Sequence, residues 1–215
     1  MSVLPIRRAS PANTIAAELR EALLSGRFAP GTPLVAGDLA ERVGTHPATV
    51  RAALAELERD GLVVHSLQRG LEVAPLTRDE LRDIYAARRV YERAGLEAML
   101  RRRPVDVSWL GAAIERMGDA AIAGDERALI EGDIAFHLAI VAAAGSRRLT
   151  RSAQGALMEL RLVLSVADRA ADDMPALVAD HELLVHVFRE ASVRESVATL
   201  DEHLVRGELL AASAL

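Results

Sequence analysis

The segment Asp38-Leu-Ala-Glu-Arg-Val-Gly44-Thr-His-Pro47-Ala-Thr-Val-Arg51-Ala-Ala-Leu-Ala-Glu-Leu57-Glu-Arg-Asp-Gly61-Leu-Val63 contains two helical patterns that meet at a short break. The first is apolar on one face and ends at Gly44, with Asp38 placed to cap its start. The second begins near Pro47, which suits a first helical turn, and ends at Gly61. Two short helices across a tight turn predict a helix-turn-helix, whose second helix can enter the DNA major groove.

A β-hairpin pattern follows the second helix directly. Valine-rich runs at 62–65 and 71–74 flank a polar turn that ends in Arg69 and Gly70. A helix, a turn, a helix and a hairpin form a winged helix, with Arg69 and Gly70 at the tip of the wing. The alternative for the two helices alone is an αα-hairpin inside any helical protein.

The remaining signals in this part of the chain set the limits of a first domain. A helical pattern covers 14–25, and Leu34–Val35 is a candidate for a short extra strand beside the wing. Residues 1–12 are polar with two prolines and are expected to form a flexible tail. The winged helix DNA-binding domain is therefore predicted to span 13–75.

The composition limits the kind of protein. The absence of cysteine excludes disulfides and thiolate metal ligands. No apolar run reaches the roughly 18–20 residues that span a bilayer, and no signal peptide precedes the first helix, so a cytoplasmic protein is expected. The net charge of −5 belongs to residues 76–215, because residues 1–75 hold 8 arginines and 8 acidic residues. The first domain as a whole is therefore not repelled by phosphate.

Residues 76–215 have a different character from residues 1–75. Six helical patterns separated by glycine or proline fill this part, and none of it resembles a strand. Capping boxes at Thr77-Arg-Asp-Glu80 and Ser192-Val-Arg-Glu195 are expected to begin the first and the last of these helices, and the fourth is expected to run from about Ser146 to Arg169. The pattern predicts an all-α antiparallel bundle, so the whole chain is expected to be mainly α, a winged helix followed by a helical domain.

Four polar residues of this bundle share helix faces with apolar neighbours. Asp133 and His137 are four residues apart and so lie on one face, and His181 and His203 also face inward. Buried together, a carboxylate and three imidazoles are costly unless they are paired. A divalent metal, most simply Zn²⁺ with Ni²⁺ or Mn²⁺ as alternatives, satisfies all four. The alternative for each histidine is a buried imidazole bonded to a neighbour.

Arg88 is a further inward-facing polar group, and a buried guanidinium needs an anion. Glu92, one helical turn away, is the structural partner that the sequence offers. The functional alternative is a ligand carboxylate shared between Arg88 and the metal.

From about Thr14 onward the chain resembles GntR-family transcription regulators of the FadR-like branch, whose effector domain is the metal-binding FCD domain. The resemblance implies a homodimer on a near-palindromic operator and a small carboxylate effector that completes the metal shell. A dimer places its recognition helices about 34 Å apart, one turn of DNA. The matching motifs are 39–44, 50–54, 57–63, Arg69-Gly70, 84–92, Asp133-Ile-Ala-Phe-His137, His181 and Glu202-His203-Leu204.

The resemblance also departs from the family pattern. Relatives usually have Ser-Arg-Thr-Pro where this chain has His46-Pro47-Ala48-Thr49, and the asparagine that follows the glycine after the third bundle helix is Ser146. The operator sequence and the effector are therefore open. The candidate DNA contacts that remain are Thr45, His46, Thr49, Arg51, Arg69 and Gly70.

Two other functions are alternatives to a ligand-controlled regulator. A metalloenzyme of small organic acids needs a general base, and the cluster offers no spare glutamate or histidine for one. The Glu-x-x-His pairs of di-metal bundles are also missing. A purely structural metal, with regulation through dimerisation, is the third possibility, and the expectation for the chain is a regulator without enzymatic activity.

Overall fold

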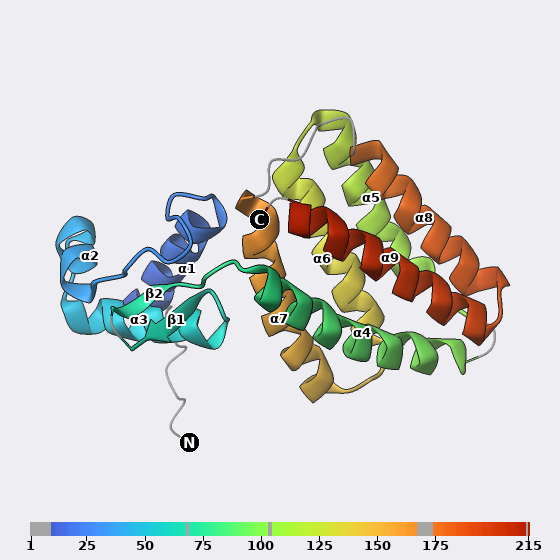
Figure 1. The fold of residues 1–215 in the computed structure, drawn as a ribbon, viewed down its shortest axis with the longest axis horizontal. Helices are drawn as coiled ribbons and strands as arrows, with labels where there is room; N and C mark the ends of the chain where they lie inside the picture. The colour runs from blue at the N-terminus through green and yellow to red at the C-terminus, as the bar shows by residue number, and fades with distance from the viewer. Residues whose placement is uncertain (1–9, 68, 103–104, 167–173, 214) are drawn as a thin grey trace, which may run out of the picture. The chain divides into compact units, whose positions relative to one another are not determined.

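The chain forms two compact units, Met1–Pro75 and Leu76–Leu215, and is mainly helical, as predicted (Figure 1). The structure, a computed structural model, describes residues 10–67, 69–102, 105–166, 174–213 and 215. None of the helices within these ranges is both long and apolar enough to cross a membrane.

The first unit is a winged helix. Its elements in chain order are α1 (Pro11–Leu24), α2 (Ala36–Val43), α3 (Pro47–Arg59), β1 (Val63–Ser66) and β2 (Gly70–Val73). The two strands pair antiparallel, from Val63 opposite Val73 to Ser66 opposite Gly70. The predicted helix-turn-helix and hairpin are both present.

Local chemistry explains the turn between α2 and α3. Gly44 adopts φ 65°, a left-handed conformation that glycine reaches without steric cost, and its N–H bonds to the carbonyl of Ala40. His46 then caps α3, since its Nδ1 accepts the N–H of Ala48, and Pro47 takes the first helical position. The apolar face of α3 packs on α1 and α2.

Two predicted boundaries in this unit were wrong. α1 begins at Pro11 with Ser10 as its N-cap, so residues 11 and 12 are helical and not part of a tail; residues 1–9 lie outside the described ranges. α2 begins at Ala36, which places Asp38 inside its first turn instead of at the cap. α1 is capped by Ser10, four residues before the predicted start, whereas the N-cap of α2 is Val35, which has no capping side chain.

The short strand predicted at Leu34–Val35 is replaced by a single bridge one residue earlier. Pro33 pairs antiparallel with Glu72, and the Leu34 N–H donates to the carbonyl of Leu71. This contact ties the segment before α2 to the free edge of β2.

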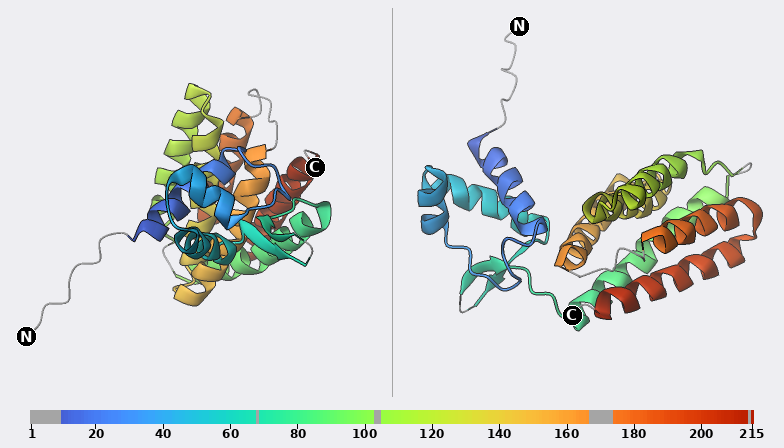
Figure 2. Two further views of the ribbon diagram at one scale, coloured as in Figure 1. Left: turned by 90° about the vertical axis from the view of Figure 1, so that its left-hand side faces the viewer. Right: turned by 90° about the horizontal axis from the view of Figure 1, so that it is seen from above.

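The second unit is a bundle of six helices within its described residues. They are α4 (Arg78–Leu100), α5 (Ser108–Ala123), α6 (Glu126–Ala142), α7 (Arg147–Val166), α8 (Met174–Glu190) and α9 (Val193–Ser213). α4 packs against α6, α7 and α9, while α8 packs against α5 and α9. The two views in Figure 2 show α8 and α9 running side by side. The predicted end of the fourth bundle helix at Arg169 lies outside the described residues.

Both capping boxes expected from the sequence are formed. Thr77 accepts the N–H of Glu80, whose carboxylate accepts the N–H of Thr77 in return. Ser192 and Glu195 repeat this exchange before α9. These caps set where α4 and α9 begin, and so which of their residues face the core.

Candidate metal centre

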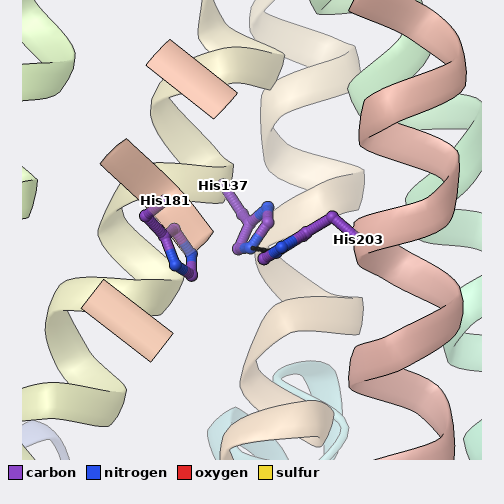
Figure 3. A group of neighbouring side chains, drawn as sticks. All are labelled: His137, His181 and His203. Carbon is purple, nitrogen blue, oxygen red and sulfur yellow. Dashed lines mark hydrogen bonds between the residues drawn. The ribbon is translucent and has the colours of Figure 1, made fainter. Parts of the chain in front are cut away.

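Three helices of the second unit bring three histidines together. His137 lies on α6, His181 on α8 and His203 on α9. Figure 3 shows their rings turned toward one another, and one ligand nitrogen from each lies within 4.8 Å of the others. The residues are 1%, 0% and 5% exposed, which leaves little water to solvate their nitrogens.

Asp133 adds an oxygen to the same point. Its Oδ1 lies 3.0 Å from His181 Nε2 and 3.7 Å from His137 Nε2, while the Nε2 atoms of His137 and His203 are 3.2 Å apart. Donors around one tetrahedral ion, with bonds of about 2.0–2.1 Å, lie roughly 3.3 Å from one another. The three distances of 3.0, 3.7 and 3.2 Å are close to this spacing, as expected for donors that could surround a single ion.

The outer nitrogen of each ring is held by an acceptor. His137 Nδ1 donates to Glu92 Oε2 at 2.6 Å and His203 Nδ1 to Asp180 Oδ2 at 2.6 Å. His181 Nδ1 donates to the carbonyl of Leu177 at 2.8 Å. Because a carboxylate or carbonyl oxygen can only accept, each Nδ1 carries the proton. Each Nε2 then presents a lone pair to the shared point, the arrangement that metal-bound histidines use.

When all three rings are neutral, this arrangement is unfavourable without a cation. The facing Nε2 atoms of His137 and His203 have no hydrogen between them when both rings are neutral. Among the described residues, the buried Nε2 of His181 also lacks a hydrogen-bond partner of adequate geometry, despite its proximity to Asp133. A buried polar atom without a partner costs about 1–3 kcal/mol. The donor set therefore fits a divalent ion, held by Asp133 and the three imidazoles.

The local packing explains why the rings cannot turn away. Phe136, fully buried, contacts His181 edge-on with ring centroids 4.8 Å apart and His137 at 5.5 Å. Asp133 and His137 are successive inward residues of α6, so the core that buries one also buries the other.

Charge and burial act differently on the ionisable groups. Burial lowers the pKa of His203 to about 4, which keeps this imidazole neutral at neutral pH. Burial also opposes protonation of His137, but the carboxylates of Glu92 and Asp133 together outweigh it, and the His137 pKa is raised. Burial alone raises the pKa of Asp133, yet the adjacent imidazoles hold it well below its usual value. Asp133 is therefore ionised and could act as a ligand to a cation.

Arg88 lies beside this cluster and is 3% exposed. Its Nε donates to Glu92 Oε1 at 2.9 Å, so the local partner that the sequence offered is used. Its Nη2, however, is buried and without a hydrogen-bond partner among the described residues, and its guanidinium carbon lies 4.8 Å from the ring centroid of Tyr85. One donor of Arg88 is thus left for an anion.

Sequence reasoning missed two residues of the centre. No sequence pattern predicts a role for Asp180, which supports His203 and also accepts from Arg206. Glu92 was considered only as a partner of Arg88, whereas its second oxygen holds His137. The only sequence signal for Asp180 was a carboxylate next to an inward histidine. A partner 23 residues away on another helix has no periodic signature.

The candidate DNA-contacting residues lie at the start of α3 and on the hairpin. Arg51 and Arg69 are exposed, and Thr45 and Thr49 are half-buried. His46 is exposed, but its Nδ1 is used in capping α3, so only Nε2 remains for another partner. Gly70 begins β2 with φ 76°, where the wing turns.

Metal affinity is expected to fall as the pH falls. An ion must displace the proton that Glu92 favours on His137, whose pKa is raised, whereas His203 is already neutral above about pH 4. Binding therefore releases at least one proton in the acid range, and log K should fall by at least about one unit per pH unit below the His137 pKa. Competition titrations with a chelator of known affinity between pH 5 and 8 measure this slope. A pH-independent affinity would contradict it.

A winged helix joined to an all-α unit with a buried polar centre defines a class, the two-domain bacterial transcription regulators. The model of the bacterial regulatory proteins of the gntR family matches residues 11–73, and the FCD domain model matches residues 83–206. The chain therefore belongs to the GntR family of helix-turn-helix transcriptional regulators and carries an FCD domain.

Individual relatives agree with this family. The chain is 32% identical over 150 residues to the HTH-type transcriptional repressor GlaR of Escherichia coli, a match that covers 61% of this chain and 62% of that protein. It is 40% identical over 70 residues to the HTH-type transcriptional regulator BphR of Paraburkholderia xenovorans, covering 33% and 29%. The matches thus span less than two thirds of either relative.

Among solved structures, a protein described as a transcriptional regulator GntR from Rhodococcus sp. RHA1 superimposes with a TM-score of 0.82. The identity is 26%, and the match covers 96% of this chain and 99% of that one. Escherichia coli McbR/YncC shares the fold with a TM-score of 0.73 at 19% identity, covering 96% and 99%.

Proposed function

We propose that the chain is a repressor whose affinity for its operator is set by a small carboxylate bound at a metal ion in the FCD domain. The observation that carries this proposal is the convergence of Asp133 and the Nε2 atoms of three histidines on one buried point. The ion proposed is Zn²⁺, with Ni²⁺ and Mn²⁺ as alternatives. When bound, it supplies an electrophilic centre that attracts a carboxylate.

The ligand's second contact is proposed to be Arg88. Its buried Nη2 has no partner among the described residues, and a guanidinium suits a carboxylate better than any neutral group. With three neutral imidazoles, the buried charges of Arg88, Glu92 and Asp133 sum to one negative charge. A divalent ion changes this to one positive charge, which favours an anion.

DNA binding is proposed to involve α3 and the hairpin. Arg51 and Arg69 are exposed cations on these elements, and Thr45, His46, Thr49 and Gly70 are the other proposed contacts. A cytoplasmic homodimer on a near-palindromic operator is the form proposed, because each chain supplies one recognition helix and two half-sites one DNA turn apart need two. The effector would act by changing the spacing of these helices, with a coupling of about 1–3 kcal/mol.

The test is binding of the full chain to DNA from the region upstream of its own gene, followed by fluorescence anisotropy at low salt. Binding is expected, and a set of small carboxylates is expected to include one that changes the affinity only when the protein carries metal. No binding at low salt, with or without metal and acids, would overturn the proposal.

Arg51→Ala is expected to weaken operator binding by losing one phosphate or base contact. A phosphate contact contributes about one unit to the slope of log K against log salt, and a bidentate base contact about 1–3 kcal/mol. The matched control is Arg116→Ala, which removes the same charge from the exposed surface of α5 in the other unit. Equal affinity losses in the two variants would show a net-charge effect only and would remove Arg51 from the interface.

A further inference from the structure

We propose that Glu92 couples the metal ion to the anion, so that each of them strengthens the binding of the other. This inference rests on the proposed function. Glu92 lies on α4 and is 1% exposed, and its two oxygens serve two different groups. Oε1 accepts from Arg88 Nε at 2.9 Å, and Oε2 accepts from His137 Nδ1 at 2.6 Å.

Both neighbours depend on this one carboxylate. His137 Nδ1 has Glu92 as its acceptor, and this bond turns the opposite nitrogen toward the ligand cluster. The guanidinium of Arg88 is planar and rigid, so fixing Nε on Glu92 also fixes the direction of Nη2. Tyr85 packs against the same guanidinium and limits its rotation. The position of this one carboxylate therefore sets the orientation of both His137 and Arg88.

The direction of the coupling follows from these bonds. A metal ion on His137 Nε2 strengthens the Nδ1–H donor and holds Glu92 in its place between the two groups. Arg88 then presents Nη2 in one fixed orientation, and an anion pays less to bind there. Thermodynamic linkage requires that the anion raise the metal affinity by the same factor.

Asp180 provides a contrast within the same centre. It supports His203 as Glu92 supports His137, and its second oxygen also accepts from an arginine, Arg206. The side chain of Arg206 is 48% exposed, however, and its bond to Asp180 is made at the surface. Asp180 therefore orients a metal ligand without a link to a buried anion site, which makes it a matched control.

The experiment measures Co²⁺ binding to the full chain by its visible absorption, with and without saturating acetate. The quantity of interest is the ratio of the two dissociation constants. In the unaltered chain acetate is expected to tighten Co²⁺ binding about fivefold or more. Both Glu92→Gln and Asp180→Asn are expected to weaken Co²⁺ binding by about 10- to 100-fold. Only Glu92→Gln should lower the ratio, to the smaller value that direct contact between acetate and the ion supplies.

The outcomes separate this inference from the proposed function. If the unaltered chain binds no Co²⁺, the proposed metal centre itself fails. If it binds Co²⁺ but acetate has no effect, or if Glu92→Gln keeps the full ratio, the metal centre stands and the coupling through Glu92 is wrong. If Asp180→Asn reduces the effect of acetate on Co²⁺ binding as much as Glu92→Gln does, any disturbance of the centre is enough to reduce it. This result would also contradict a specific role for Glu92.

A second variant covers the case in which Glu92→Gln does not fold because Arg88 is left without its anion. Arg88→Met combined with Glu92→Met removes both charges at similar volume, a change that is often neutral or stabilising for a buried ion pair. This variant should fold, bind Co²⁺ about 10- to 100-fold more weakly and show a reduced effect of acetate. A full acetate effect in it would overturn the inference.

Discussion

Replacing His181 by alanine is expected to weaken zinc binding by about 10²- to 10³-fold. A zinc ion held by four protein ligands contributes about 10–16 kcal/mol at neutral pH, so one ligand accounts for roughly a quarter of that free energy. His181 is fully buried, and its Nε2 has no hydrogen-bond partner elsewhere in the described structure. The substitution should therefore weaken metal binding more than it destabilises the fold.

The matched control is His186→Ala, on the same helix α8 but exposed to solvent. Zinc is expected to raise the melting temperature of the unaltered chain and of His186→Ala alike, because an ion that binds only the folded state stabilises it. The His181→Ala chain should show little of this rise at the same zinc concentration. If zinc raised the melting temperatures of both variants equally, zinc would bind elsewhere.

Replacing Gly95 by alanine is expected to destabilise the second unit by about 3 kcal/mol or more. A Cβ at this position would lie 2.0 Å from the carbonyl oxygen of Ile140 and 2.8 Å from Cα of Val141. Both are backbone atoms of α6, so no side chain can move aside and α4 and α6 would have to separate. Glu92 and His137 lie on these two helices, so metal affinity should fall as well.

The control for Gly95 is Gly155→Ala in α7. A Cβ there meets nothing within 4 Å, and alanine in a helix is better than glycine by about 0.5–1 kcal/mol. Denaturant unfolding followed by the fluorescence of Trp109, the single tryptophan and a residue of the second unit, measures both variants. Similar small effects of the two substitutions would contradict the close approach of α4 to α6.

Much of the fold could be predicted from residue patterns, because these patterns reflect local chemistry. Gly44 and Gly124 end helices in left-handed conformations, and Thr77 and Glu80 form the expected capping box. The start of α2 was misplaced because Asp38 resembles a cap, whereas the helix begins two residues earlier at Ala36, with Val35 as its N-cap. A local signal marks the region of a helix end better than the exact residue.

In the candidate site, too, some features could be predicted from the sequence and others could not. The spacing of Asp133 and His137 placed both on the inner face of α6, and burial of His181 and His203 followed from their apolar neighbours. The point at which α6, α8 and α9 bring their histidines together depends on tertiary packing. The acceptor that each histidine Nδ1 finds depends on tertiary packing as well. For this reason neither the support of His203 by Asp180 nor the double role of Glu92 was predicted from the sequence.

The most direct measurement of the central claim is X-ray absorption at the zinc edge on the zinc-loaded full chain. One ion per chain is expected, with three imidazole nitrogens and at least one oxygen at about 2.0–2.2 Å. The His181→Ala chain should lose one imidazole from this shell if any zinc is retained. A stoichiometric ion with fewer than three imidazoles, or no stoichiometric ion at all, would contradict the account.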